Sequence, residues 1–151
     1  MNVERCLAQI REACPSHELQ VYSLPMDETV VELPAAYLKP VVTALVEQGT
    51  VSHMSTITGQ DMGDAIELLY HFWEGSGLTL RTSLPRYEST IPSLTDLIPG
   101  ASFYEREIAE MLHVTFEGHP EPTGLLLPDD WDGMGPLRKE FTPPSSKEAP
   151  S

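Results

Sequence analysis

The stretch AIELLYHFWEGSGLTLRTSL, residues 65–84, decides the fold of this chain. Residues 78–84 alternate apolar and polar side chains, which is the period of a strand with one buried face. Residues 65–73 are apolar on both sides, as in a strand at the centre of a sheet. The EGSG at 74–77 supplies the glycines that a tight chain reversal requires. This stretch therefore predicts a β-hairpin in the middle of a sheet.

The hairpin is flanked by segments with helical or strand character. Asn2 is a candidate N-cap for a helix that ends near Cys14, and Gly49 is a candidate C-terminal cap for a second helix. Pro40 fits that second helix only if it lies in the first turn. The other predicted elements are a strand at 19–24, a turn at 25–27, a strand at 28–33, a helix at 37–48, a strand at 51–58, a turn at 59–64 and a short capped helix at 93–96.

This order of elements predicts a fold of the α+β class. We expect a single domain in which helices pack on one face of a mixed or antiparallel β-sheet. The domain is expected to cover residues 1–142, and its C-terminal segment, rich in Pro and Gly, is expected to run extended over a surface. Residues 143–151 are expected to be a flexible tail.

The composition excludes several classes of function. The 9 Lys and Arg against 23 Asp and Glu give a net charge of −14, which opposes binding to nucleic acid or to an anionic membrane surface. The two cysteines, Cys6 and Cys14, are too few for a self-contained iron–sulfur cluster or structural zinc site. The N-terminal residues are too polar for a signal peptide, and no segment is apolar over the length of a membrane span.

A charged helix is predicted in residues 104–118, YEREIAEMLHVTFEG. Ser102 and Glu105 have the spacing of a capping box, which places the start of the helix there. The helical period puts an apolar stripe on one side, made of Tyr104, Ile108, Met111 and Leu112. The period puts Arg106, Glu110 and His113 on the opposite side, where Arg106 and Glu110 have the spacing of a surface ion pair.

Two interpretations of this helix follow from the residues alone. In the first, Glu110 and His113 bind a metal ion together with His119, since a carboxylate and an imidazole three residues apart serve as ligands in helical bundles. In the second, the charged side faces solvent or a partner protein, and we favour this interpretation because the chain has one such motif. The adjacent basic residues Arg138 and Lys139 either fold back on the glutamates or contact a partner.

A family resemblance rests on these same residues. YEREIAEMLHVTFEGHP at 104–120, followed by GPLRKEF at 135–141, resembles the signature of the complex I thirty-kilodalton subunit family. That family comprises the C subunits of NADH–quinone oxidoreductases and related subunits of deazaflavin-dependent dehydrogenases and energy-converting membrane-bound hydrogenases. Where the family usually has Gly, this chain has His113, so either the turn is reshaped or the helix gains a residue.

The resemblance implies a cofactor-free structural subunit in the peripheral arm of a membrane oxidoreductase. Such a subunit lies on the cytoplasmic side of the membrane beside the quinone-site subunit and the small iron–sulfur subunit, and the clusters belong to those partners. No residue of this chain is then catalytic, and none binds a metal or a cofactor. The residues that the resemblance assigns to the partner interface are Glu105, Arg106, Glu107, Glu110, His119, Pro120, Pro136, Leu137, Arg138, Lys139 and Phe141.

Three hypotheses for the function stay open at this level. The first is a subunit of a complex, either of the NADH–quinone oxidoreductase type or an energy-converting membrane-bound hydrogenase. The second is a small metal-dependent enzyme that uses Glu110, His113 and His119. The third is an independent acidic binding module that descends from the same family. The electron donor and acceptor are properties of other subunits and do not follow from this sequence.

Overall fold

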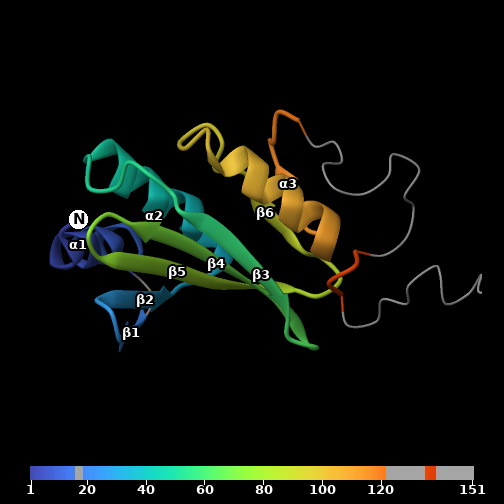
Figure 1. Cartoon of the computed structure of the whole chain (residues 1–151), viewed down its shortest axis with the longest axis horizontal. Helices are drawn as coiled ribbons and strands as arrows, with labels where there is room; N and C mark the ends of the chain where they lie inside the picture. Colours follow the sequence, from blue (N-terminus) through green and yellow to red (C-terminus); the bar gives the residue numbers. More distant parts are fainter. Residues whose placement is uncertain (16–18, 122–134, 139–151) are drawn as a thin grey trace, which may run out of the picture.

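The computed structural model describes residues 1–15, 19–121 and 135–138. It confirms a single α+β domain with a five-stranded mixed sheet of order β1-β2-β5-β4-β3 and a two-stranded sheet of β6 and β7 (Figure 1). The elements are α1 Val3–Ala13, β1 Gln20–Leu24, β2 Glu28–Glu32, α2 Ala35–Glu47, β3 Thr56–Asp61, β4 Ala65–Trp73, β5 Gly77–Pro85, β6 Thr90–Pro92, α3 Ala101–Leu112 and β7 Thr115–Glu117. The expected tail at 143–151 lies outside the described residues.

The predicted central hairpin is confirmed as β4 and β5. The two strands pair antiparallel from Ala65 opposite Pro85 to Trp73 opposite Gly77. β5 also pairs in parallel with β2, so both hairpin strands lie inside the sheet. Every second residue of β4 and β5 is buried on one face, and these are Ile66, Leu68, Tyr70, Phe72, Leu78, Leu80, Thr82 and Leu84. This face carries the core.

The helices cover that core face (Figure 1). The side chain of Asn2 caps α1 by accepting a hydrogen bond from the Arg5 amide, as predicted. In α2, Leu38, Val41, Val42 and Leu45 are fully buried in the same cluster as the sheet residues. Helix α2 begins at Ala35, so Pro40 lies beyond the first turn, which corrects the expectation for this residue. The position is tolerated because Ala36, whose carbonyl loses its helical partner there, is exposed to water.

Several sequence expectations were wrong at element boundaries. β3 spans Thr56–Asp61, so residues 51–55 are irregular and the predicted turn at 59–61 is strand. Residues 93–96 do not form a short helix: a turn covers 95–97, and the Ser93 hydroxyl accepts a hydrogen bond from the Thr95 amide and donates to Glu105. The helix predicted over 104–118 was wrong at its end, because α3 stops at Leu112 and β7 occupies Thr115–Glu117. The short parallel strands β6 and β7 were missed, since neither has enough residues to show an alternating pattern.

The two cysteines are buried and free. Burial raises the thiol pKa of both Cys6 and Cys14 above the ordinary value, which keeps them protonated. Among the helices of the described ranges, none has the length and apolar character that a membrane crossing requires.

Candidate functional site around helix α3

Helix α3 lies against the outer strand β3 and is held there by close packing. Its buried face consists of Ala101, Glu105, Ile108 and Leu112. The sheet contributes Gly59, where an added Cβ would lie 2.5 Å from Leu112 Cδ1 and 2.8 Å from Ile108 Cδ1. The predicted apolar stripe is therefore confirmed at Ile108 and Leu112. Tyr104 and Met111 are only half-buried, because the helix is rotated to place Glu105 inside.

Glu105 does not form the predicted capping box. The N-cap is Gly100, which makes no side-chain capping bond. The Glu105 side chain is fully buried, where its carboxylate accepts hydrogen bonds of 2.7 Å from the Leu94 amide and 2.7 Å from the Ser93 hydroxyl. Burial raises the pKa of this carboxyl above the ordinary glutamate value, although both hydrogen bonds oppose the rise. Glu105 thus fastens α3 to the turn that precedes it.

His119 joins the same buried cluster from the segment that follows β7. Its Nδ1 accepts a hydrogen bond from the Glu121 amide at 3.0 Å, so Nε2 carries the proton and donates to the Ser102 carbonyl at 3.2 Å. The Nε2 atom lies 3.9 Å from the Glu105 carboxylate, and only 3% of the His119 side chain is exposed. The motif Gly118-His119-Pro120 therefore closes a turn over the N-terminal half of α3.

His113 ends α3 in the left-handed conformation, with φ 59° and ψ 41°. The helix stops at Leu112, so His113 does not extend it. Its backbone takes the conformation that glycine adopts without strain, and its side chain is exposed. Of the two sequence expectations at this position, the gain of a helical residue was wrong, and a reshaped turn stays a prediction.

Arg138 is buried at the C-terminal end of α3. Its Nε donates to the Leu112 carbonyl at 2.5 Å, Nη1 donates to the Arg86 carbonyl at 2.9 Å, and Nη2 lies 3.4 Å from the Ser89 hydroxyl. The neighbouring Leu137 amide donates to the Met111 carbonyl at 2.8 Å. Burial lowers the pKa of the Arg138 guanidinium from its ordinary value. Arg138 thus folds back on backbone carbonyls near the end of the helix.

The other predicted interface residues lie on or near the outer side of α3. Arg106, Glu107 and Glu110 are half-buried on the helix, and Arg106 lies 3.8 Å from the Glu121 carboxylate. Pro120 is exposed, Pro136 is half-buried, and 57% of Leu137 is accessible. Lys139 and Phe141 lie outside the described residues. The outer side of α3 also presents Phe103, which is 51% exposed and which no sequence pattern singled out.

The metal hypothesis finds no support in this geometry. Glu110, His113 and His119 do not gather around a common point, and the described part of the chain contains no group of three His, Cys, Asp or Glu residues that would hold a metal ion. His119 uses both ring nitrogens for hydrogen bonds within the protein.

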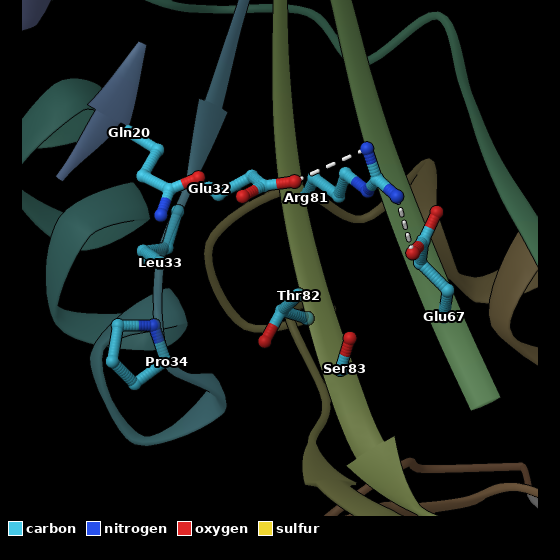
Figure 2. Close-up of a pocket in the computed structure, with 8 residues that line it drawn as sticks. All are labelled: Gln20, Glu32, Leu33, Pro34, Glu67, Arg81, Thr82 and Ser83. Atoms are coloured by element: carbon cyan, nitrogen blue, oxygen red, sulfur yellow. Dashed lines mark hydrogen bonds and ion pairs between the residues drawn. The ribbon is translucent and has the colours of Figure 1, made fainter. Parts of the chain in front are cut away.

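A second polar region crosses the sheet face opposite the core. We name it the open-face ladder: Gln60, Glu67, Arg81, Glu32, Tyr22 and Gln20. Arg81 lies between two carboxylates, 2.7 Å from Glu67 and 3.1 Å from Glu32 (Figure 2). The hydrogen bond with Glu67 raises the pKa of Arg81 above its ordinary value. Four of these residues, Gln20, Glu32, Glu67 and Arg81, line an open hollow of about 350 Å³ together with Leu33 and Pro34.

The ladder was missed in the sequence, although a signal for it exists. Glu67 interrupts an otherwise apolar strand, and Arg81 occupies a polar position of the opposing strand. Once the hairpin is predicted, its register places the two side chains on the same face, and opposite charges there indicate a cross-strand pair. The contribution of Glu32 required knowledge that β2 pairs with β5, which no local pattern contains.

Comparisons of the sequence with known proteins identify the family of this chain. The family model described as "Respiratory-chain NADH dehydrogenase, 30 Kd subunit" matches residues 31–147. The chain is 34% identical over 121 residues to the C subunit of the NADH-quinone oxidoreductase of Moorella thermoacetica, and the match covers 77% of this chain and 81% of that protein. The chain belongs to this family of respiratory-chain subunits, which confirms the resemblance seen in the sequence.

Solved structures show the same fold. The trypsin-resistant fragment of Nqo5 aligns with a TM-score of 0.68 at 24% identity, over 80% of this chain and 99% of that one. A chain of the membrane-bound sulfane sulfur reductase, an archaeal respiratory membrane complex, aligns with a TM-score of 0.79 at 24% identity, over 97% of this chain and 89% of that one.

Proposed function

We propose that this chain is a structural subunit in the peripheral arm of a membrane oxidoreductase of the NADH–quinone oxidoreductase type. It docks beside the quinone-site subunit and the small iron–sulfur subunit on the cytoplasmic side of the membrane, and the redox centres lie in those partners. The observation that carries this proposal is the family match, which extends over most of the folded domain.

The geometry divides the predicted interface residues into two groups, one that is buried and one that lies on the outer side of α3. Glu105, His119 and Arg138 have their polar atoms engaged inside the chain, where they hold α3 and the segments on either side of it. Arg106, Glu107 and Glu110 lie on the outer side of the same helix. In our proposal the first group fixes the position of the helix, and the second group contacts the partner protein.

The charges on the outer side of α3 explain why an interface with a partner protein requires this helix to be held rigidly. Charged groups that become desolvated in an interface stabilise it only when their partners are placed well, and loss of one partner from a desolvated pair costs about 2–5 kcal/mol. A helix fixed by buried hydrogen bonds at both ends presents its outer charges in one arrangement, which lowers the entropic cost of docking.

Affinity purification of the tagged chain from gently solubilised membranes tests the proposal. Recovery of iron–sulfur and membrane-embedded subunits, identified by mass spectrometry, is the expected result, and those subunits also name the electron donor and acceptor. Hydrogenase subunits in their place would assign the chain to an energy-converting hydrogenase. Recovery of the chain alone from the soluble fraction would overturn the proposal and favour an independent binding module.

Metal analysis of the purified chain tests the remaining alternative, which is a metal-dependent enzyme. Stoichiometric iron, zinc or manganese that is lost on Glu110→Ala would contradict a purely structural role. The control is Glu107→Ala, which removes a carboxylate from the same helix without touching the candidate ligands.

A further inference from the structure

Strand β1 forms one outer edge of the five-stranded sheet, where, among the described strands, it pairs with β2 alone (Figure 1). Along Gln20–Leu24 every residue except Val21 is exposed. The exposed set includes two large side chains, Tyr22 at 42% and Leu24 at 46%, and Met26 in the adjoining turn is 84% exposed. In an edge strand, alternate residues direct their amides and carbonyls away from the sheet, so β1 offers a row of backbone hydrogen-bonding groups.

Within the described residues, strand β1 has no Lys, Pro or bulge of the kind by which proteins prevent strand addition. Natural edge strands are protected by Lys, by Pro, by bulges or by a covering element. The sequence of β1, QVYSL, has no charged residue, no Pro and no Gly, and its five pairs with β2 run without a bulge. The opposite edge strand, β3, differs in sequence, because TITGQD contains a glycine and ends in the charged Asp61.

The open-face ladder orders the side chains of β1 on which an added strand would pack. Arg81 orders Glu32, the Glu32 carboxylate accepts a hydrogen bond from the Tyr22 hydroxyl at 3.2 Å, and that hydroxyl also lies 2.6 Å from the Gln20 side-chain oxygen. The ladder therefore extends from β3 to the last strand and holds Tyr22 in place. A side chain that is already ordered loses little entropy when another strand packs beside it.

Charge selects the kind of strand that fits. The chain has a net charge of −14, and β2 places Glu28 and Glu32 directly behind β1. Glu32 is paired with Arg81, whereas the Glu28 carboxylate accepts a hydrogen bond from the neutral Thr79 hydroxyl. Glu28 lies opposite Leu24, and strand spacing puts it about 10 Å from the axis of an added strand, within reach of a Lys or Arg side chain. A second copy of this acidic chain would be repelled, whereas a strand with basic residues would be attracted.

We propose that the outer edge of β1 pairs with an extended, basic segment of a partner protein, which continues the sheet by one strand. Backbone hydrogen bonds along Gln20–Leu24 supply the affinity, and the partner's side chains cover Tyr22 and Leu24. The inference deepens the proposed function and rests on it, since the segment belongs to another subunit of the same complex.

Hydrogen exchange tests the proposal on the protein as it exists. Exchange of the β1 amides is measured by mass spectrometry in the isolated chain and in the complex purified through the tagged chain. We expect the segment 19–24 to be protected in the complex and alternate amides to exchange freely in the isolated chain. Equal exchange in both states would overturn the inference. Protection in the isolated chain that rises with its concentration would assign the edge to a second copy and would also overturn it.

Three variants identify what the partner recognises, with partner recovery at increasing salt as the readout. Leu24→Lys adds a positive charge at the edge and is expected to reduce recovery about tenfold, whereas Leu24→Glu, which removes the same apolar side chain, is expected to reduce it less. Ser83→Lys is the control, because Ser83 is exposed on the same face in the central strand β5. It is expected to leave recovery unchanged.

The outcomes separate this inference from the proposed function. If the wild-type chain recovers no partner subunits, the proposed function fails. If it recovers them but Leu24→Lys has no effect, the edge inference alone fails. A loss with Ser83→Lys as large as that with Leu24→Lys would show that the partner covers the open face, and would overturn strand addition.

Discussion

Two buried carboxylates, one on each side of the five-stranded sheet, are held by different kinds of donor. On the core face, Glu105 is fully buried and is held by neutral donors, an amide and a hydroxyl. On the open face, Glu67 is 5% exposed and is held by the Arg81 guanidinium and the Gln60 amide. Burial raises the pKa of Glu105, because its neutral donors do not offset the loss of water around the charge.

Rigidity on the core face therefore has a different origin from order on the open face. Buried hydrogen bonds from neutral donors fix α3 in one position, and burial shields them from salt. In the open-face ladder, Arg81 and Glu32 are about one third exposed, so their ion pair orders side chains but contributes little net stability. Variants on the two faces should differ in size of effect, in pH dependence and in salt dependence.

The largest effect is expected for Arg138→Ala. It removes the donor from the buried Leu112 carbonyl and the partly buried Arg86 carbonyl, and the unsatisfied acceptors cost about 3 kcal/mol in total. Urea unfolding of the isolated chain measures the loss. The matched control is Arg106→Ala on the outer side of α3, for which we expect a change below about 1 kcal/mol together with weaker assembly. Equal losses of stability in the two variants would contradict the division between them.

A smaller effect, with a diagnostic pH dependence, is expected for Glu105→Gln. The amide can still accept from the Leu94 amide and donate to the Ser93 hydroxyl, so the variant should fold, with a loss of about 1 kcal/mol at low pH. The raised pKa of Glu105 means that the folded state retains a proton that the unfolded chain has released. The stability from this group is full below the ordinary glutamate pKa and is lost as pH rises through the raised value.

The measurement is the free energy of unfolding of wild type and Glu105→Gln at a series of pH values. Wild-type stability relative to the variant should fall as the pH rises above 4.5, the ordinary glutamate pKa. A difference that stays constant as the pH rises from there to neutrality would show that the carboxyl keeps an ordinary pKa in the folded protein.

On the open face, Arg81→Gln should reduce stability by about 1 kcal/mol at low salt, because the Arg81 guanidinium is 35% exposed and the glutamine amide can still donate to the buried Glu67 carboxylate. The loss should shrink in high salt, since mobile ions screen the charges that remain. Thermal unfolding at two salt concentrations checks this. A salt-independent loss as large as that of Arg138→Ala would contradict the contrast between the faces.

The smallest effect concerns His71, which lies on the open face beside the ladder. Its Nδ1 donates to the Thr79 hydroxyl at 2.9 Å, that hydroxyl donates to Glu28 at 2.8 Å, and Nε2 accepts from Thr58 at 3.1 Å. Burial lowers the pKa of His71 below 6.5, although the Glu28 carboxylate opposes this. The stability that depends on neutral His71 is therefore lost as pH falls below that value.

Titration of the imidazole by NMR measures this pKa directly. Thr58→Val removes the donor to Nε2 and should raise the pKa of His71, whereas Glu28→Gln removes the nearby negative charge and should lower it further. A titration with the ordinary histidine pKa in the wild-type protein would show that the imidazole is hydrated on this face.

The sequence predicted those parts of the molecule whose determinants are local. The hairpin 65–84 was found from its alternation and its glycines, and α1 was found from its cap at Asn2. The family was recognised from two short motifs. The boundaries of β3 were not found, because the strand's first residues and the preceding loop have similar composition, and tertiary pairing with β4 selects between them.

The role of Glu105 marks the limit of interpreting one helix by itself. By spacing alone, Ser102 and Glu105 satisfy the pattern of a capping box. In the folded chain, the carboxylate instead accepts hydrogen bonds from Ser93 and Leu94, which a turn brings over the helix. Arg138 is similar, since its partners are carbonyls from α3 and from the loop after β5.

The sequence by itself determined the α+β class, the central hairpin, the acidic charge and the family, because the elements and motifs follow from residues close together in the chain and the charge follows from composition. Only the tertiary structure decided which polar residues form buried hydrogen bonds that hold α3 and which remain on the surface. It also decided that β1 is an outer edge of the sheet. Strand order and helix rotation depend on packing between segments far apart in sequence, and no local pattern encodes that packing.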